Sequence, residues 1–139
     1  MVEPPAVALR RLPPDPVQFQ VMLGSLLGDG RLVGLPHARR LRIAHREDRS
    51  GYVRWKYDRL GAFAAAPPRA DAGVVSFETV IHPLFDDLAA LLRAGRTRMD
   101  AVGPLLRPLG LAVWLADVGR LDLRAGSFLP MQQELALAS

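Results

Sequence analysis

The chain has 139 residues, half of which are hydrophobic, and it carries a formal net charge of +4 at pH 7. This length and composition predict one packed domain, or one domain with part of a second, and they exclude a disordered chain. The sequence holds no cysteine, which excludes disulfides and thiolate metal sites. Its apolar stretches are too short to cross a membrane, and prolines interrupt any N-terminal signal core. We expect a cytoplasmic protein with no membrane partner.

The basic residues are almost all arginine: of the 18 Lys and Arg residues, only Lys56 is a lysine. One interpretation is polyanion binding, because the planar guanidinium group suits phosphates and guanine edges. The other is a GC-rich genome whose codons favour arginine. Composition alone does not separate the two, so the position of the arginine clusters matters more than their number.

A proline-rich arm over residues 1–14 precedes the first predicted helix. Asp15 is a typical N-cap, and Pro16 suits the first helical position. The helix that follows is apolar nearly all round, which predicts burial on several sides. Gly24 and Gly28 would weaken an isolated helix, by up to about 1 kcal/mol each relative to alanine. We therefore expect a second backbone to approach the helix closely at these glycines.

The next segment, residues 31–46, has the character of a strand interrupted at 34–36. Leu41 and Ile43 alternate with arginines, which predicts a sheet with one buried face and one basic, exposed face. Further along we expect a helix capped by Asp48 or Ser50 and closed at Pro67, a strand over 74–81 after a turn at 71–73, a helix from Pro83 to Gly95, a linker over 96–103, and a helix from Pro108.

Two of the expected helices are similar to each other. Each is apolar, follows a strong start signal and ends at a glycine, Gly30 in the first case and Gly119 in the second. This pattern indicates a weak internal repeat. Two unrelated buried helices with glycine stops would give the same pattern.

Read together, these segments resemble the LAGLIDADG homing-endonuclease family. MLGSLLGDG (22–30) is similar to the first of its paired motifs, and PLGLAVWLADVG (108–119) to the second. LRIAHREDRSGYVRWKYDRL (41–60) resembles the strand and helix after the first motif. FETVIHPLFDDLAALLRAG (77–95) resembles the section that leads to the second. The resemblance covers roughly 17–128, and its order and spacing make it more specific than any one motif.

The resemblance implies an α/β (α+β) fold of the form αββαββα, with a saddle-shaped antiparallel sheet that lies on double-stranded DNA. It implies site-specific hydrolysis of phosphodiester bonds and mobility of an intron or intein. The acid at the penultimate motif position, here Asp29, would be catalytic and would bind Mg²⁺ or Mn²⁺. Such hard cations prefer carboxylate oxygens and neutralise charge on a reacting phosphate. The small residues at which the motif helices would pack are Gly24, Gly28, Ala112 and Ala116.

The second motif departs from the family pattern at the position that matters. When Gly119 is aligned with Gly30, Val118 stands opposite Asp29, and valine binds no metal. Asp117 is adjacent, but one helical step turns a side chain by about 100°, so it is a poor substitute ligand. We expect half of the metal site to be lost, which favours a nickase or an impaired enzyme.

Length is the second departure. The sequence predicts a first repeat over 15–104 and, over 105–139, the second motif helix with a truncated start of the second repeat. In that remainder, 121–129 resembles a strand and 130–139 the opening of a helix. Either the chain is a truncated remnant, or a second subunit completes it, as a homodimer or with another chain.

The residues expected at the DNA follow the first motif. His45 has the parity of Leu41 and Ile43, so a partly buried structural histidine is the alternative for it. The basic residues of the next helix, Arg49, Arg54, Lys56 and Arg59, suit either backbone phosphates or a solvated face. Tyr52, Trp55 and Tyr57 are expected in the core. The expected DNA contacts are Arg31, Arg39, Arg40, Arg42, His45 and Arg46.

Three other functions stay open at this stage. One is a DNA-binding module without catalysis. Another is a maturase that binds structured intron RNA. A third is a decayed remnant with no specific binding. Salt dependence separates the binders from the remnant, because phosphate contacts weaken steeply as salt rises.

Overall fold

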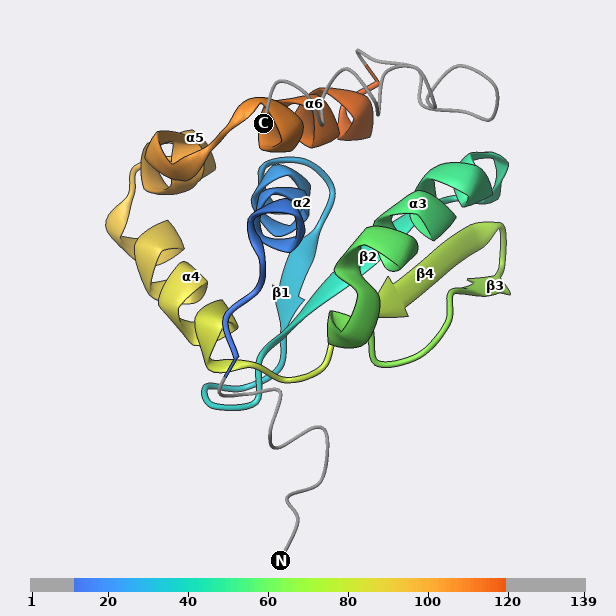
Figure 1. Cartoon of the computed structure of the whole chain (residues 1–139), viewed down its shortest axis with the longest axis horizontal. Helices are drawn as coiled ribbons and strands as arrows, with labels where there is room; N and C mark the ends of the chain where they lie inside the picture. Colours follow the sequence, from blue (N-terminus) through green and yellow to red (C-terminus); the bar gives the residue numbers. More distant parts are fainter. Residues whose placement is uncertain (1–11, 120–139) are drawn as a thin grey trace, which may run out of the picture.

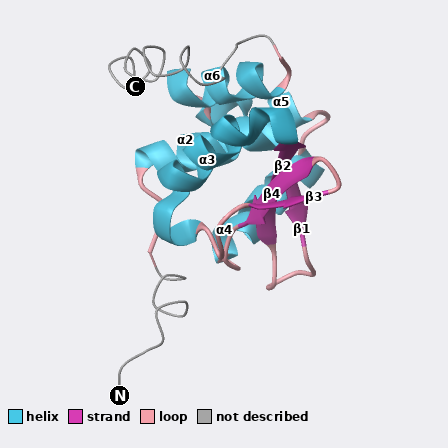
Figure 2. Cartoon of the chain, turned by 90° about the vertical axis from the view of Figure 1, so that its right-hand side faces the viewer, coloured by secondary structure: helices cyan, strands magenta, loops and turns pink. Residues whose placement is uncertain are grey.

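The computed structural model describes residues 12–119, which form a four-stranded sheet and the helices packed around it (Figures 1 and 2). The elements, in chain order, are α2 (Pro16–Leu27), β1 (Arg31–Val33), β2 (Arg40–Arg46), η1 (Glu47–Arg49), α3 (Ser50–Leu60), η2 (Gly61–Phe63), β3 (Arg69–Asp71), β4 (Val74–Glu78), α4 (Pro83–Ala94), α5 (Arg98–Val102), η3 (Gly103–Leu105) and α6 (Pro108–Asp117).

Helix α2 begins where the sequence predicts. The Asp15 side chain accepts a hydrogen bond from the main-chain N–H of Gln18, at 2.7 Å, and the Gln18 side chain accepts one from that of Asp15, at 2.9 Å. This reciprocal capping box satisfies two amides that the first helical turn leaves unpaired. Most of the helix is buried, since α3 and α6 both contact it.

The sheet is antiparallel throughout, in the order β1-β2-β4-β3. Along β2, Leu41, Ile43 and His45 are buried, whereas Arg42 and Arg46 are exposed. The alternation confirms a sheet with one core face and one basic face. Helix α3 packs against β2 and β4, while α6 lies on the side of α2 that faces away from β1 (Figure 1).

Close packing of α2 against α6 depends on a glycine. A Cβ atom at Gly24 would lie 2.6 Å from the Cβ of Val113 and would also overlap the main-chain carbonyl oxygen of Gly110. Ala112 and Ala116 are buried on α6. The two motif-like helices therefore contact each other along small residues, and any larger side chain at Gly24 would separate them.

Some local expectations were wrong. The expected linker over 96–103 contains α5, which Thr97 caps by accepting a hydrogen bond from the N–H of Asp100. Neither Asp48 nor Ser50 caps α3, because the short helix η1 leads directly into it and Arg49 stands at the N-cap. Strand β3 was not foreseen, since its three exposed residues show no apolar alternation.

The strand expected over 121–129 and the helix expected over 130–139 lie outside the described residues. Within 12–119, none of the helices combines the length and the apolar character needed to span a membrane.

Candidate active site

Asp29 follows the C-terminal end of α2 and points into an open cleft of about 800 Å³. Its turn is closed by a hydrogen bond from the N–H of Gly30 to the carbonyl oxygen of Ser25, at 2.7 Å. The Asp29 side chain is 53% exposed, so its carboxylate is accessible from the cleft. Other residues that line the cleft are Arg31, Arg46, Arg49, Arg98, Asp117 and Val118.

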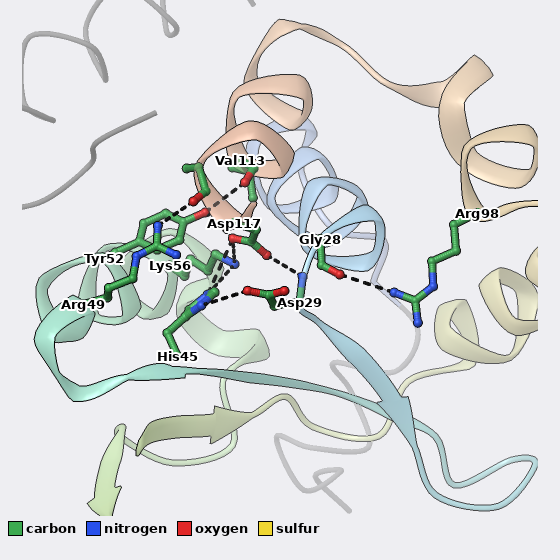
Figure 3. Close-up of polar contacts among 10 residues, drawn as sticks. Gly28, Asp29, His45, Arg49, Tyr52, Lys56, Arg98, Val113 and Asp117 are labelled. Atoms are coloured by element: carbon green, nitrogen blue, oxygen red, sulfur yellow. Dashed lines mark hydrogen bonds and ion pairs between the residues drawn. The ribbon is translucent and has the colours of Figure 1, made fainter. Parts of the chain in front are cut away.

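Asp117, at the end of α6, is buried beside Asp29 (Figure 3). One carboxylate oxygen, Oδ1, accepts hydrogen bonds from the Tyr52 hydroxyl, at 2.6 Å, and from Lys56 Nζ, at 2.8 Å. The other oxygen, Oδ2, accepts the main-chain N–H of Asp29 at 3.0 Å. The Asp117 side chain has no solvent exposure. Its oxygens are thus occupied by protein donors.

Lys56 was expected on a phosphate-binding or solvated helix face, and both interpretations were wrong. Its side chain is fully buried and forms an ion pair with Asp117. Tyr52 and Lys56 are four residues apart on α3, so they share one helix face, and that face points into the core. Burial lowers the pKa of Lys56, while the Asp117 carboxylate opposes this effect. Burial first, and then the Asp117 carboxylate, raise the pKa of Tyr52.

His45 lies between the two carboxylates. Its Nε2 is 3.2 Å from Lys56 Nζ and 3.6 Å from Asp117 Oδ1, and its Nδ1 is 3.6 Å from Asp29 Oδ2. Burial, followed by the Lys56 charge, lowers the pKa of His45 to about 4, so the ring is neutral at pH 7. Because an ammonium group only donates, Nε2 accepts from Lys56 and the ring proton lies on Nδ1, facing Asp29.

Two arginines donate hydrogen bonds to main-chain carbonyl groups at the C-terminal ends of α2 and α6. Arg49 donates to the carbonyl oxygen of Ala116 in α6, at 2.6 Å. Arg98 donates to the carbonyl oxygen of Leu26 in α2, at 2.8 Å, and more weakly to that of Gly28, at 3.4 Å. Positive groups at helix C-termini are favourable because they offset the helix dipole. The role of Arg98 was missed in the sequence, where no local pattern links it to α2.

The surroundings of Asp29 disfavour the ionised form of its carboxyl group. Its pKa is raised, first by partial burial and then by the negative charge of Asp117, whereas Lys56, Arg49 and Arg31 act in the opposite direction. A cation bound at Asp29 would relieve this repulsion. The site therefore presents one accessible carboxylate that a positive charge would stabilise.

A divalent metal fits this donor set only in part. Among residues 12–119, no group of three or more His, Cys, Asp and Glu side chains converges as a metal site. Asp29 offers free oxygens, Asp117 does not, and Val118 lies on the cleft wall with 48% exposure. Mg²⁺ is commonly held by one or two carboxylates together with substrate phosphates and water. Asp29 suits such a shared site once a phosphate is bound.

The exposed face of the sheet carries several of the arginines expected at DNA. Arg31 and Arg42 are directly opposite each other on β1 and β2, so their side chains share this face. Arg46 lies further along it, near the cleft. Arg69 of β3 adds a positive charge that no local sequence pattern indicates, because the exposed residues of β3 show no apolar alternation.

Several of the arginines expected at DNA also have acidic partners within the protein. Arg40 Nε is 2.6 Å from a Glu78 oxygen, and Arg42 is 3.7 Å from the other oxygen of the same carboxylate. Arg39 is largely buried in an ion pair with Asp86 of α4, at 3.2 Å. Arg46 is 3.2 Å from Asp48, but its side chain is 83% exposed. Arg31 and Arg46 both line the cleft, so exposed positive charge extends along the face to Asp29.

A model of the LAGLIDADG DNA endonuclease family matches residues 19–135. The chain is also similar to the protein RecA of Mycolicibacterium flavescens, with 34% identity over 116 residues, and to that of Mycobacterium shimoidei, with 34% identity over 119 residues. Each match covers 78% of this chain but 27% of the relative. The chain thus spans about a quarter of the length of the curated relatives that it matches.

Among solved structures, the fold is similar to that of the homing endonuclease I-WcaI bound to its DNA recognition sequence. The TM-score is 0.62 at 18% sequence identity, and the match covers 84% of this chain and 59% of that one. At this identity the likeness establishes the fold. It agrees with the mixed helix and antiparallel-strand architecture expected from the sequence.

Proposed function

Because the chain belongs to the LAGLIDADG DNA endonuclease family, we propose that it binds double-stranded DNA and hydrolyses one phosphodiester bond at Asp29. The observation that carries the proposal is the accessible Asp29 carboxylate in a cleft lined with arginines. A lone aspartate after a helix would mean little. Its position beside the basic face of a sheet means that a polyanion bound to that face would lie within reach of the carboxylate.

DNA binding is supported by the distribution of charge. Arg31, Arg42 and Arg46 share the exposed face of the sheet, and Arg46 reaches the cleft that contains Asp29. Arginine binds phosphates and base edges through its planar group of donors. A duplex that lies across the sheet would therefore bring a phosphate to Asp29. We expect the affinity to fall steeply as salt rises.

The chemistry assigned to Asp29 is metal binding. A divalent cation held between Asp29 and the phosphate would neutralise charge on the reacting group. The raised pKa of Asp29 agrees with this role: burial first, and then the charge of Asp117, disfavour its bare carboxylate, and a cation nearby would stabilise it. The chain's own part is to hold that carboxylate at the cleft wall and to orient the phosphate with arginines.

We further propose that only one strand is cut. A second metal would need a carboxylate at the end of α6, where Val118 stands on the cleft wall and Asp117 is buried against Lys56. Hydrophobic Val118 offers no ligand, and freeing Asp117 would leave a buried ammonium group unpaired. These two features favour nicking over double-strand cleavage.

The test is a nicking assay on supercoiled plasmid that carries the gene's own insertion locus, with Mg²⁺ or Mn²⁺. Wild type is compared with Asp29→Asn, which keeps the size of the side chain and removes its charge. We expect nicked circles from wild type and none from the variant, with equal DNA retardation by both. Nicking by Asp29→Asn at the wild-type rate would rule out the proposal.

Val118→Asp sharpens the same assay. The substitution places a carboxylate on the cleft wall at an exposed position, so the fold should tolerate it. If α6 supplies the missing ligand, linear plasmid should appear beside nicked circles. If linear product stays absent while nicking continues, the second half-site lacks more than this carboxylate.

The main alternative is a DNA-binding module without catalysis. The single accessible carboxylate favours it, because of the two aspartates that line the described cleft only Asp29 has an exposed side chain. Retardation of the plasmid without metal-dependent nicking would support this alternative. Competition by structured intron RNA at lower concentrations than by duplex DNA would point instead to a maturase.

Mobility of a host intron or intein is the final part of the proposal. The matches to proteins named RecA cover only about a quarter of those chains, and the same region of this chain fits an endonuclease family. An endonuclease segment carried inside a longer polypeptide would give such a pattern. Cleavage of an allele without the insertion, and no cleavage of the occupied allele, is the expected result.

A further inference from the structure

We propose that Asp117 is a positioning residue, which holds Asp29 through its main-chain N–H. Lys56 and Tyr52 in turn hold the carboxylate of Asp117. The proposal rests on the proposed role of Asp29 in cleavage. The acid of the second motif would then act through Asp29, with no contact to metal or DNA of its own.

The first observation is the way in which both Asp117 oxygens are used. Oδ2 faces the turn after α2 and accepts the N–H of Asp29 at 3.0 Å. Oδ1 faces α3 and accepts two donors, the Tyr52 hydroxyl and Lys56 Nζ. A carboxylate fixed by two donors on one side is a rigid acceptor for a third donor on the other. Asp117 thereby connects the turn that carries Asp29 to α3.

The second observation is how closely Asp117 lies against that turn. A Cβ atom at Gly28 would overlap the Cβ of Asp117 and would lie 2.5 Å from its Oδ2. The backbone at Gly28 and the carboxylate are therefore in direct contact. No side chain fits between them, so a shift of Asp117 would be passed to the next residue, Asp29.

His45 adds contact with the Asp29 side chain. Lys56 donates to its Nε2, which leaves the proton on Nδ1, and Nδ1 is 3.6 Å from Asp29 Oδ2. This distance is longer than a hydrogen bond. The main-chain bond from Asp117 is accordingly the stronger restraint, and the one that we assign.

The experiment replaces the buried pair as a unit, because either single change would leave a charge buried without its partner. In the full-length chain, Lys56→Met/Asp117→Leu removes both charges and the acceptor for the Asp29 amide. Lys56→Met/Asp117→Asn removes the same charges but keeps an amide oxygen as acceptor. The matched control is Asp87→Asn/Arg93→Met on the surface of α4, where both residues are exposed.

At saturating DNA, we expect the Leu double variant to nick plasmid about 10- to 100-fold more slowly than wild type, because a small misplacement of a catalytic group slows a reaction to about this extent. Its DNA affinity without metal should stay within about twofold, because no phosphate contact is changed. The Asn double variant should recover part of the rate. The α4 control should match wild type in every measurement.

A readout independent of cleavage is the amide resonance of Asp29 in solution NMR. Loss of its charged acceptor should shift this resonance and speed its hydrogen exchange in the Leu variant, with a smaller change in the Asn variant. Mn²⁺, added with DNA, should broaden the Asp29 resonance in wild type. A merely structural role for Asp117 would instead change thermal stability and leave the nicking rate of the folded variants unchanged.

The possible failures are distinguishable. If wild type nicks through Asp29 and the folded Leu variant nicks equally fast, the positioning role is overturned and the proposed function stands. If wild type neither nicks nor shows Mn²⁺ broadening at Asp29, both proposals are overturned. Should the Leu variant fail to fold, Tyr52→Phe serves instead. It removes one donor to Asp117 and should slow nicking less than the Leu variant was expected to.

Discussion

The ends of α2 and α6 lie side by side, and each brings an aspartate to the same cleft. At the end of α2, Asp29 lies two residues beyond the last helical residue, Leu27, and its side chain is 53% exposed. At the end of α6, Asp117 is itself the last helical residue, and its side chain is completely buried. The residue that follows it, Val118, occupies the exposed position.

The difference shows that two similar sequence motifs can place the same chemistry in opposite environments. Helix α2 ends three residues before Gly30, whereas α6 ends two residues before Gly119. The shift in helix length, together with the shift of the acid by one position, directs Asp117 toward Lys56 and leaves Asp29 at the cleft. One carboxylate is then accessible from the cleft, and the other is buried in an ion pair with Lys56.

The largest effect is expected from breaking the Lys56–Asp117 pair. Lys56→Met should lower the free energy of unfolding by about 3–5 kcal/mol, because it leaves the Asp117 charge buried and unpaired. Asp117→Leu should cost a similar amount. Lys56→Met/Asp117→Leu should recover most of the loss, since a buried ion pair is commonly replaced by apolar side chains at little cost. Urea denaturation of the four proteins measures the coupling.

Additive effects in that cycle would contradict the structure, because residues in direct contact are expected to couple. Asp29→Asn with Lys56→Met is the comparison at the other helix end. Asp29 is exposed and forms no hydrogen bond with Lys56 in the structure. Its removal should therefore recover much less of the loss in Lys56→Met than Asp117→Leu does, namely only the small gain expected from ending its repulsion by Asp117.

Acid pH should destabilise the region between the two aspartates. The pKa of His45 is lowered from 6.5 to about 4 in the folded chain, by burial first and by Lys56 second. Between these values the unfolded chain binds the proton more readily than the folded chain. The contribution of neutral His45 to the free energy of unfolding is therefore fully present above pH 6.5 and is lost as the pH falls toward 4. A shift of this size corresponds to at most roughly 3 kcal/mol.

The measurement is the free energy of unfolding from pH 7 to 4, for wild type and for His45→Gln. The variant should lose the part of the pH dependence that His45 supplies. The charged groups that face the His45 ring in wild type, Asp29, Asp117, Lys56 and Arg49, are all still present in the variant. If the two curves run parallel over this range, His45 is not buried in its neutral form.

The packing of the two helix ends can be disturbed without any change of charge. Gly24→Ala should lower the free energy of unfolding by about 1–3 kcal/mol, because the added methyl group overlaps the backbone of Gly110 and the side chain of Val113. Gly51→Ala is the control within α3, where a Cβ would meet nothing within 4 Å. This second change should stabilise the protein by up to about 1 kcal/mol. Equal effects of the two substitutions in thermal denaturation would contradict the close contact of α2 and α6.

The sequence predicted the parts of the fold that have local signals. The cap at Asp15, the alternation of Leu41 with Ile43, and the helix from Pro83 were all read from neighbouring residues and are present. Strand β3 was missed because its pairing with β4 is made by the backbone and leaves no apolar pattern. Helix α5 was missed although Thr97 and Asp100 have the spacing of a cap.

The candidate site was only half predictable for a similar reason. Asp29 was identified through the resemblance of its motif, and the structure places it in the cleft. The burial of Lys56 depends on Asp117, which lies 61 residues away in the sequence. A lysine between Trp55 and Tyr57 has the local pattern of a surface residue, and only the tertiary contact gives it a partner.

The smallest expected effect concerns the exposed acid. Burial and the charge of Asp117 raise the pKa of Asp29, so its ionised form destabilises the fold at neutral pH. The sign is opposite to that of His45: between the ordinary pKa and the raised one, the folded state binds the proton more readily, and stability gains as the pH falls. Asp29→Asn should therefore raise the melting temperature at pH 7, by about 1–3 °C after allowance for solvent screening of an exposed group. The gain should shrink near pH 4. A lower melting temperature in the variant would mean that Asp29 stabilises the helix end, and that this acid is not held there at a cost to the fold.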